Sequence, residues 1–113
     1  MKKPIVTAIN DLTKYKFNGE LLSKRSLVIT IVKDFVANHP KMKLEELAGK
    51  FPIPMRAMKD AHDKSRFFAD KDDVIKTLDV AKVVLSNQIR KEMIDKFVTV
   101  ARGLGYKISK VSQ

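Results

Sequence analysis

The longest regular pattern of apolar and polar positions in the chain runs from Lys24 to His39. Its apolar residues recur three and four positions apart, which places them on one broad face of a helix. These residues are Leu27, Val28, Ile31, Val32, Phe35 and Val36. Ser23 stands at the N-cap position, and Pro40 ends the helix because proline disfavours helical geometry in the residue before it. A face this wide needs partners on more than one side, so we expect the central helix of a small globular domain.

The segment before this helix has the alternating pattern of a β-hairpin. Tyr15-Lys16-Phe17 alternates between apolar and polar residues, and Glu20-Leu21-Leu22 forms the return strand. Asn18-Gly19 between them readily takes the positive φ angles of a tight hairpin turn. Further upstream, Ile5 to Ile9 is expected to be a short strand or part of an arm.

Two more helices are predicted after Pro40. Apolar residues at helical spacing indicate a short helix from Lys43 to Lys50, which Pro52 ends. Pro54 suits the first position of a third helix, where its missing N–H costs nothing, and that helix would include Met55 to His62. Three helices joined by tight turns are typical of a helix-turn-helix domain.

Beyond His62 the spacing changes to that of strands. Arg66-Phe67-Phe68 has an extended pattern, and a polar turn follows at residues 70–73. The segments Val74 to Leu78 and Ala81 to Leu85 are rich in β-branched residues and flank the short connection Asp79-Val80. A hairpin placed after three helices predicts the wing of a winged helix-turn-helix.

The last apolar periodicity predicts a long helix from Gln88 to Arg102, capped by Ser86 or Asn87. Gly103 would then take the left-handed conformation that ends many helices, and Tyr106 to Ile108 would form a final edge strand. The pattern as a whole predicts an α+β, winged helix-turn-helix-like fold with about four helices and a β-hairpin wing.

The length of 113 residues fits one domain, 1–113, with an N-terminal arm at 1–14 and a loose tail at 109–113. The chain holds 23 basic and 13 acidic residues, a formal net charge of +10. A charge this large predicts a polyanionic partner, most often nucleic acid. Lysine supplies most of it, and lysine binds phosphates as a point charge, whereas arginine forms the bidentate contacts that read guanine. The composition therefore favours contacts with the nucleic-acid backbone.

Other compositional features narrow the function classes. The chain has no cysteine, which rules out disulfides and thiolate metal sites. No apolar run approaches the ~20 residues of a membrane span, and the apolar stretch near the N-terminus is too short for a signal peptide. We therefore expect no membrane contact and a cytoplasmic location.

Several short motifs between Phe17 and Ile108 occur in the same order as in a known type of domain. They are Phe17-Asn18-Gly19, Leu22-Ser23-Lys24, Glu45-Glu46-Leu47, Phe51-Pro52, Arg66-Phe67-Phe68, Asp73-Val74-Ile75, Ser86-Asn87-Gln88, Phe97 and Leu104 to Ile108. Together they resemble a small winged-helix-like domain of bacterial and phage proteins, some of them linked to restriction-modification. The resemblance implies a nucleic-acid-associated, phage-encoded module, and it supplies no catalytic residues. The chain departs from it at Ile89, where tryptophan is usual, and at Asp79-Val80, where a glycine is usual.

Six basic residues are the candidate nucleic-acid-binding site. The third helix would present Arg56, Lys59 and Lys64 to the major groove, and the wing would bring Lys76 and Lys82 to flanking phosphates. Arg66 precedes the wing and completes the set. Because a base-reading helix usually offers more amide and guanidinium groups near its start, we expect low sequence selectivity.

The sequence offers little for catalysis. His62-Asp63 lacks the further histidines and carboxylates of a metal phosphohydrolase, and Asp70, Asp72 and Asp73 are better explained as a turn than as a metal site. No serine has a recognisable base partner. We therefore predict a protein that is not an enzyme and needs no metal or cofactor.

The sequence leaves two main functions open. The first is a DNA-binding accessory or regulatory protein that contacts mainly the phosphates of double-stranded DNA. The second is a phage-type inhibitor or adaptor that docks on an acidic surface of a host nuclease or polymerase. RNA binding is disfavoured because the 8 aromatic residues (2 Tyr and 6 Phe) lie mostly in core-like patterns. The chain would be a monomer, or a homodimer through its last helix.

Overall fold

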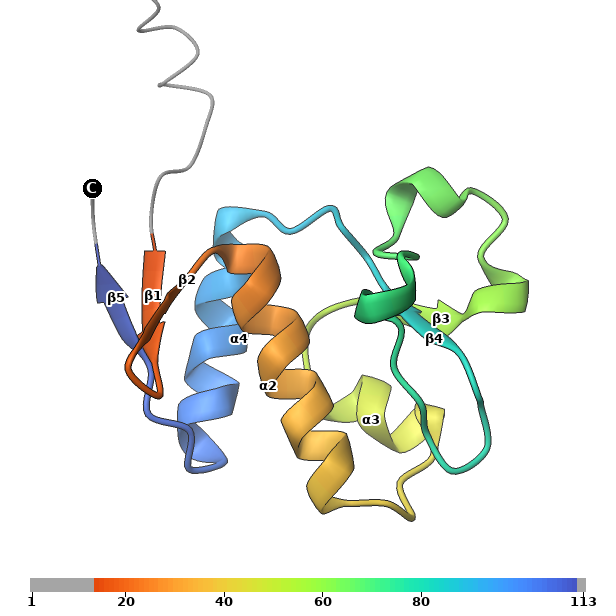
Figure 1. Cartoon of the computed structure of the whole chain (residues 1–113), viewed down its shortest axis with the longest axis horizontal. Helices are drawn as coiled ribbons and strands as arrows, with labels where there is room; N and C mark the ends of the chain where they lie inside the picture. The colour runs from red at the N-terminus through yellow and green to blue at the C-terminus, as the bar shows by residue number, and fades with distance from the viewer. Residues whose placement is uncertain (1–13, 112–113) are drawn as a thin grey trace, which may run out of the picture.

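Helix α2 (Lys24–Asn38) runs between two small β-sheets in the computed structural model, which describes residues 14–111 (Figure 1). The Oγ of Ser23 accepts a hydrogen bond from the N–H of Ser26, so Ser23 caps the helix as predicted. The buried residues of α2 include Leu27, Val28, Ile31, Val32 and Phe35. The central helix and its apolar face are thus confirmed, and so is the general α+β class.

The predicted N-terminal hairpin is also present. Strand β1 (Lys14–Phe17) pairs antiparallel with β2 (Glu20–Leu22). Asn18 and Gly19 have φ angles of 52° and 80°, as a two-residue turn with two left-handed positions requires. The possible strand Ile5 to Ile9 and most of the 1–14 arm lie outside the described residues.

The other edge of β1 pairs with β5 (Ser109–Val111), which gives the strand order β2-β1-β5. The strand predicted at Tyr106 to Ile108 is therefore placed three residues too early, and residues 109–111 are not a loose tail. Two bonds from the guanidinium of Arg102 to the carbonyl of Ile108 hold the chain just before β5. Pairing with β1 then satisfies the backbone polar groups of the strand.

Helix α3 (Leu44–Lys50) is confirmed, but the third helix predicted from Met55 to His62 is wrong. Met55–Ala57 forms strand β3, and a 3-10 helix follows at Met58–Asp60. Strand β3 pairs antiparallel with β4 (Val83–Leu85). Long-range pairing has overridden the helical preference of this segment, and its buried-exposed-buried pattern has the period of a strand.

The hairpin predicted at Val74 to Leu85 is present only in part, and the winged-helix arrangement is not confirmed. Ile75 pairs with Val83 through a single bridge, and the N–H of Thr77 donates to the carbonyl of Val80 to close the turn. The main partner of β4 is nevertheless β3, on its other side. Before the hairpin, residues 71–73 form a 3-10 helix within the predicted polar turn, and Phe67 bridges to Ser86.

The last helix, α4 (Lys91–Gly103), begins three residues later than predicted. The Oγ of Ser86 accepts from the N–H of Gln88 and does not cap α4. At the other end the left-handed residue is Gly105, with φ of 101°, and not Gly103. The N–H of Tyr106 bonds to the carbonyl of Ala101, and that of Gly105 to the carbonyl of Arg102, which is the Schellman pattern. The described residues thus contain three α-helices, one fewer than predicted.

One core joins these elements. Helix α4 buries Ile94, Phe97, Val98 and Ala101, and it lies beside α2 (Figure 1). The ring of Phe51 lies between those of Phe35 and Phe97, with both centroid distances at 5.3 Å. None of the helices in residues 14–111 is long and apolar enough to cross a membrane.

Candidate nucleic-acid interface

The candidate interface begins where the β3–β4 ladder ends. Ala57 lies opposite Val83, and one residue further the N–H of Met58 donates to the carbonyl of Lys82 at 2.8 Å. This bond turns the chain from β3 into the 3-10 helix that carries Lys59. Met58, Lys59 and Lys82 are therefore held close together by backbone pairing, although Lys82 is more than twenty positions from the other two in the sequence.

The tip of the 75–83 hairpin is fixed by polar contacts with α3. The carboxylate of Asp79 accepts a hydrogen bond from the N–H of Leu44 at 2.9 Å and another from the hydroxyl of Thr77 at 3.1 Å. The Leu44 N–H is the largest cause of the lowered pKa of Asp79, so this carboxyl stays ionised well into the acid range. The N–H of Leu78 adds a 2.9 Å bond to the carbonyl of Met42. The hairpin tip thus has a defined position over the start of α3.

Lys64 lies on a second turn that is anchored to the end of β4. Asp63 Oδ1 accepts from the N–H of Ser65 at 3.1 Å, and hydrogen bonds from Ser65 are the main cause of the lowered pKa of Asp63. Asn87 binds the turn from the other side. Its backbone N–H donates to the carbonyl of Arg66 at 2.9 Å, and its side-chain amide donates to the backbone carbonyl of Ser65 at 2.8 Å.

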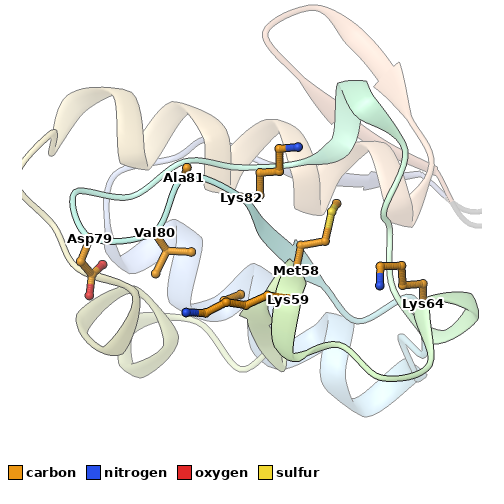
Figure 2. A pocket seen from close by; sticks show the side chains of 8 residues that line it. Met58, Lys59, Lys64, Asp79, Val80, Ala81 and Lys82 are labelled. Carbon is orange, nitrogen blue, oxygen red and sulfur yellow. The ribbon is translucent and has the colours of Figure 1, made fainter.

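These segments surround an open hollow of about 460 Å³. Its lining residues are Ala57, Met58, Lys59, Lys64, Asp79, Val80, Ala81 and Lys82. In the view of Figure 2, the end of Met58 lies between those of Lys82 and Lys64, whereas Lys59 extends the other way, towards Val80 and Asp79. Half of the lining residues are apolar, and three are lysines. The volume falls in the range of about 300–1,000 Å³ that is usual for small-ligand sites.

The charge of the lining is strongly positive. Lys59, Lys64 and Lys82 are exposed, and none forms an ion pair with another residue in the described part of the chain. The acidic residue of the lining, Asp79, has its carboxylate bonded to Leu44 and Thr77. With the ionised Asp79 included, the lining carries a net charge of +2, which leaves a positive potential at the hollow.

The structure therefore brings together three of the six predicted site residues, Lys59, Lys64 and Lys82. Arg56 does not line the hollow: it is exposed on β3 between two buried neighbours. Lys76 is likewise exposed between buried residues, outside the lining. Arg66 pairs with Asp63 at 3.4 Å, which offsets part of its charge.

The sequence analysis missed the apolar part of the lining. Met58 was placed in the predicted third helix, and Val80 and Ala81 were assigned to a turn and a strand. Met58 is half-buried and Ala81 is exposed. A usable signal was present, because Met58 precedes Lys59 and Ala81 precedes Lys82, so an apolar residue adjoins a lysine in both segments.

The acidic segment 70–73 has a structural partner. The guanidinium of Arg25, at the start of α2, pairs with the carboxylates of Asp70 and Asp73 and lies 4.8 Å from the centroid of the Phe68 ring. The two carboxylates raise the pKa of Arg25, and the largest cause is the hydrogen bond to Asp73. Within residues 14–111 no group of three His, Cys, Asp or Glu side chains is arranged to hold a metal ion.

Comparison of the chain with protein-family models, with curated proteins and with solved structures finds no match. The resemblance to the winged-helix-like domain stays a prediction. The geometry of the hollow and its charge are therefore the basis for a proposed function.

Proposed function

We propose that this protein binds double-stranded DNA mainly through the phosphates, as an accessory or regulatory protein with low sequence selectivity. The observation that carries the proposal is the convergence of Lys59, Lys64 and Lys82, which have no ion-pair partner among the described residues, from separate segments on one hollow. Binding would neutralise DNA phosphates and release condensed counterions, which makes affinity fall steeply with salt.

The proposal differs from the winged-helix mode expected from the sequence. A winged helix reads bases with a helix in the major groove, but the segment expected to form that helix is strand β3 and a 3-10 helix. The contact surface would instead be the rim of the hollow, and Arg56 and Lys76 are exposed cations outside it. Lysine point charges on such a rim suit phosphates better than base edges, which supports low selectivity.

The test is fluorescence anisotropy with a short random-sequence duplex at several salt concentrations. The slope of log affinity against log salt changes by roughly 0.9 for each phosphate contact, so replacing Lys59, Lys64 and Lys82 together by alanine should lower its magnitude by about 2–3. The matched control replaces three exposed lysines elsewhere, Lys41, Lys50 and Lys91, with the same loss of charge. The control should change the slope by less than about 1.

The proposal fails if the wild-type protein does not bind the duplex even at low salt. It also fails if the two triple variants lower the slope equally, because net charge and not the hollow would then govern binding.

A second candidate is a protein-binding inhibitor or adaptor, and the apolar half of the hollow is the observation that favours it. Ala57, Met58, Val80 and Ala81 could receive an apolar side chain of a partner whose acidic residues contact the lysines, which is how many interface anchors are built. Absence of DNA binding, together with capture of an acidic partner that depends on the three lysines, would favour this function over the first.

The oligomeric state is part of the proposal. The apolar face of α4 is used within the protein itself, since Ile94, Phe97, Val98 and Ala101 are buried in the described part of a single chain. We therefore expect a monomer and not a dimer through α4. Light scattering coupled to size exclusion would measure this directly.

A further inference from the structure

The hollow has more apolar surface than contact with a duplex backbone can use. A DNA duplex presents phosphates and sugars along its outside and keeps its bases stacked inside. Contact of that kind would neutralise Lys59, Lys64 and Lys82. The apolar lining residues Met58, Val80 and Ala81 would remain in contact with water. The ligand that matches the whole lining has a flat apolar body joined directly to phosphate groups.

We propose that the hollow holds the base of one unpaired nucleotide of a DNA strand while the three lysines bind the neighbouring phosphates. This inference rests on the proposed function and refines it, because it predicts a preference for DNA that has unpaired nucleotides. The source is a strand and not a free nucleotide because three separate ammonium groups are matched better by a run of phosphodiesters than by a single phosphate.

The side chain best suited to contact the base is Met58. Its thioether sulfur is polarizable and packs favourably against aromatic rings. In the view of Figure 2 the Met58 sulfur lies between the ends of Lys82 and Lys64, so a ring against the sulfur would have these two ammonium groups beside it for its phosphates. Val80 and Ala81, from the 75–83 hairpin, complete the apolar part together with Ala57.

The lining also sets the expected strength and selectivity. Single-strand-binding proteins gain about 1–3 kcal/mol per base from stacking on aromatic rings. The described lining contains no aromatic ring, so the gain here should lie at or just below the low end of that range, about threefold to tenfold in affinity. The carboxylate of Asp79 is the acceptor group of a lining side chain that could distinguish one base from another, and it is already bonded to Leu44 and Thr77. We expect little discrimination among bases.

The experiment compares a blunt duplex with the same duplex carrying a short single-stranded end, both fluorescently labelled. Wild-type protein should bind the second about threefold to tenfold more tightly. Ala81→Leu adds apolar volume to the hollow without changing its charge, and Ala81 is exposed, so the fold should tolerate it. This variant should lower the affinity for the duplex with the single-stranded end more than the affinity for the blunt duplex, so the preference should shrink. The control Ala48→Leu makes the same change at an exposed position of α3 and should behave as wild type.

A second readout uses the wild-type protein alone. Ring currents should shift the methyl NMR signal of Met58 when DNA with the single-stranded end is added, and the blunt duplex should shift it much less. Equal affinity for the two duplexes, or an unchanged Met58 signal, would overturn the inference. Binding of the blunt duplex in the same titration shows whether the proposed function itself has failed. A free mononucleotide that displaces the labelled strand as effectively as unlabelled strand would also overturn it, in favour of a small-ligand site.

Discussion

Thr77 offers the sharpest test of the forces that shape the hairpin beside the hollow. It is one of the few buried polar residues, with a relative exposure of 3%. Its hydroxyl accepts a hydrogen bond from the N–H of Val80 at 3.2 Å and lies 3.1 Å from the carboxylate of Asp79. Since that carboxylate is the charged and closer of its two possible acceptors, the hydroxyl proton is donated there. Valine has the same branched shape, so Thr77→Val removes these bonds with little change in volume.

Two effects oppose each other in this variant. Replacing the hydroxyl by a methyl group at a buried position is worth up to about 0.8 kcal/mol in favour of the folded state. Against it, the N–H of Val80 loses its partner in a partly buried turn, which costs about 1–3 kcal/mol. The lost bond to Asp79 is not included in the sum, because water can replace it at an exposed carboxylate. We therefore expect a net destabilisation of about 1–2 kcal/mol, or roughly 3–8 °C in Tm for a domain of this size.

The measurement is urea and thermal unfolding followed by circular dichroism. Thr30→Val is the matched control, because Thr30 is exposed on α2 and the same change there should alter stability by less than about 0.5 kcal/mol. If Thr77→Val is as stable as wild type, the hydrogen bonds of the Thr77 hydroxyl do not hold the hairpin, and the reasoning is refuted. If it is more stable, apolar burial outweighs them.

The remaining predictions concern two contacts that hold other segments to α2. Arg25→Met should lower stability by about 1 kcal/mol. Exposed ion pairs are worth about 0.2–1 kcal/mol, and the cation–π contact with Phe68 is worth about 0.5–1 kcal/mol. A urea midpoint equal to that of the wild type would contradict this. Tyr106→Phe should cost about 0.5–1.5 kcal/mol, because the Tyr106 hydroxyl donates to Asp34 at 2.8 Å. Burial and this bond raise the pKa of Tyr106, so its contribution is fully present below the pKa of an unfolded tyrosine and is lost as pH rises beyond it. The stability difference between wild type and Tyr106→Phe should therefore shrink above about pH 10, and a constant difference would contradict the assignment.

Local sequence signals were sufficient for the elements whose formation depends on neighbouring residues. Ser23 and the apolar spacing that follows it define α2, because the N-cap and the apolar face belong to one continuous segment. Asn18-Gly19 defines the first hairpin for the same reason, since the turn needs two positive φ angles in succession. The left-handed residue after α4 was placed two positions too early, because Gly103 and Gly105 both suit a left-handed cap and the Schellman bonds select the second.

The segment Met55–Ala57 could not be assigned from its neighbours. Pro54 before it and the apolar spacing within it are compatible with a helix, and nothing nearby signals a strand. Its conformation is decided by β4, which starts at Val83 and offers a free edge to pair with. The segment alternates apolar, polar and apolar as a strand would, but three residues are too few to distinguish this period from a helical one, so the helix was predicted and the strand was found.

The same long-range pairing explains why half of the candidate residues meet although the predicted fold was partly wrong. Lys59 and Lys82 were expected on a recognition helix and a wing, elements that would contact DNA side by side. They are near each other because the Met58 N–H bonds to the Lys82 carbonyl at the end of the β3–β4 ladder. Arg56 would have shared a helical face with Lys59, but a strand sends alternate residues to opposite sides, so Arg56 is exposed away from the hollow. Charge and chain order thus predicted which segments carry the cations, and strand geometry decided which of those cations act together.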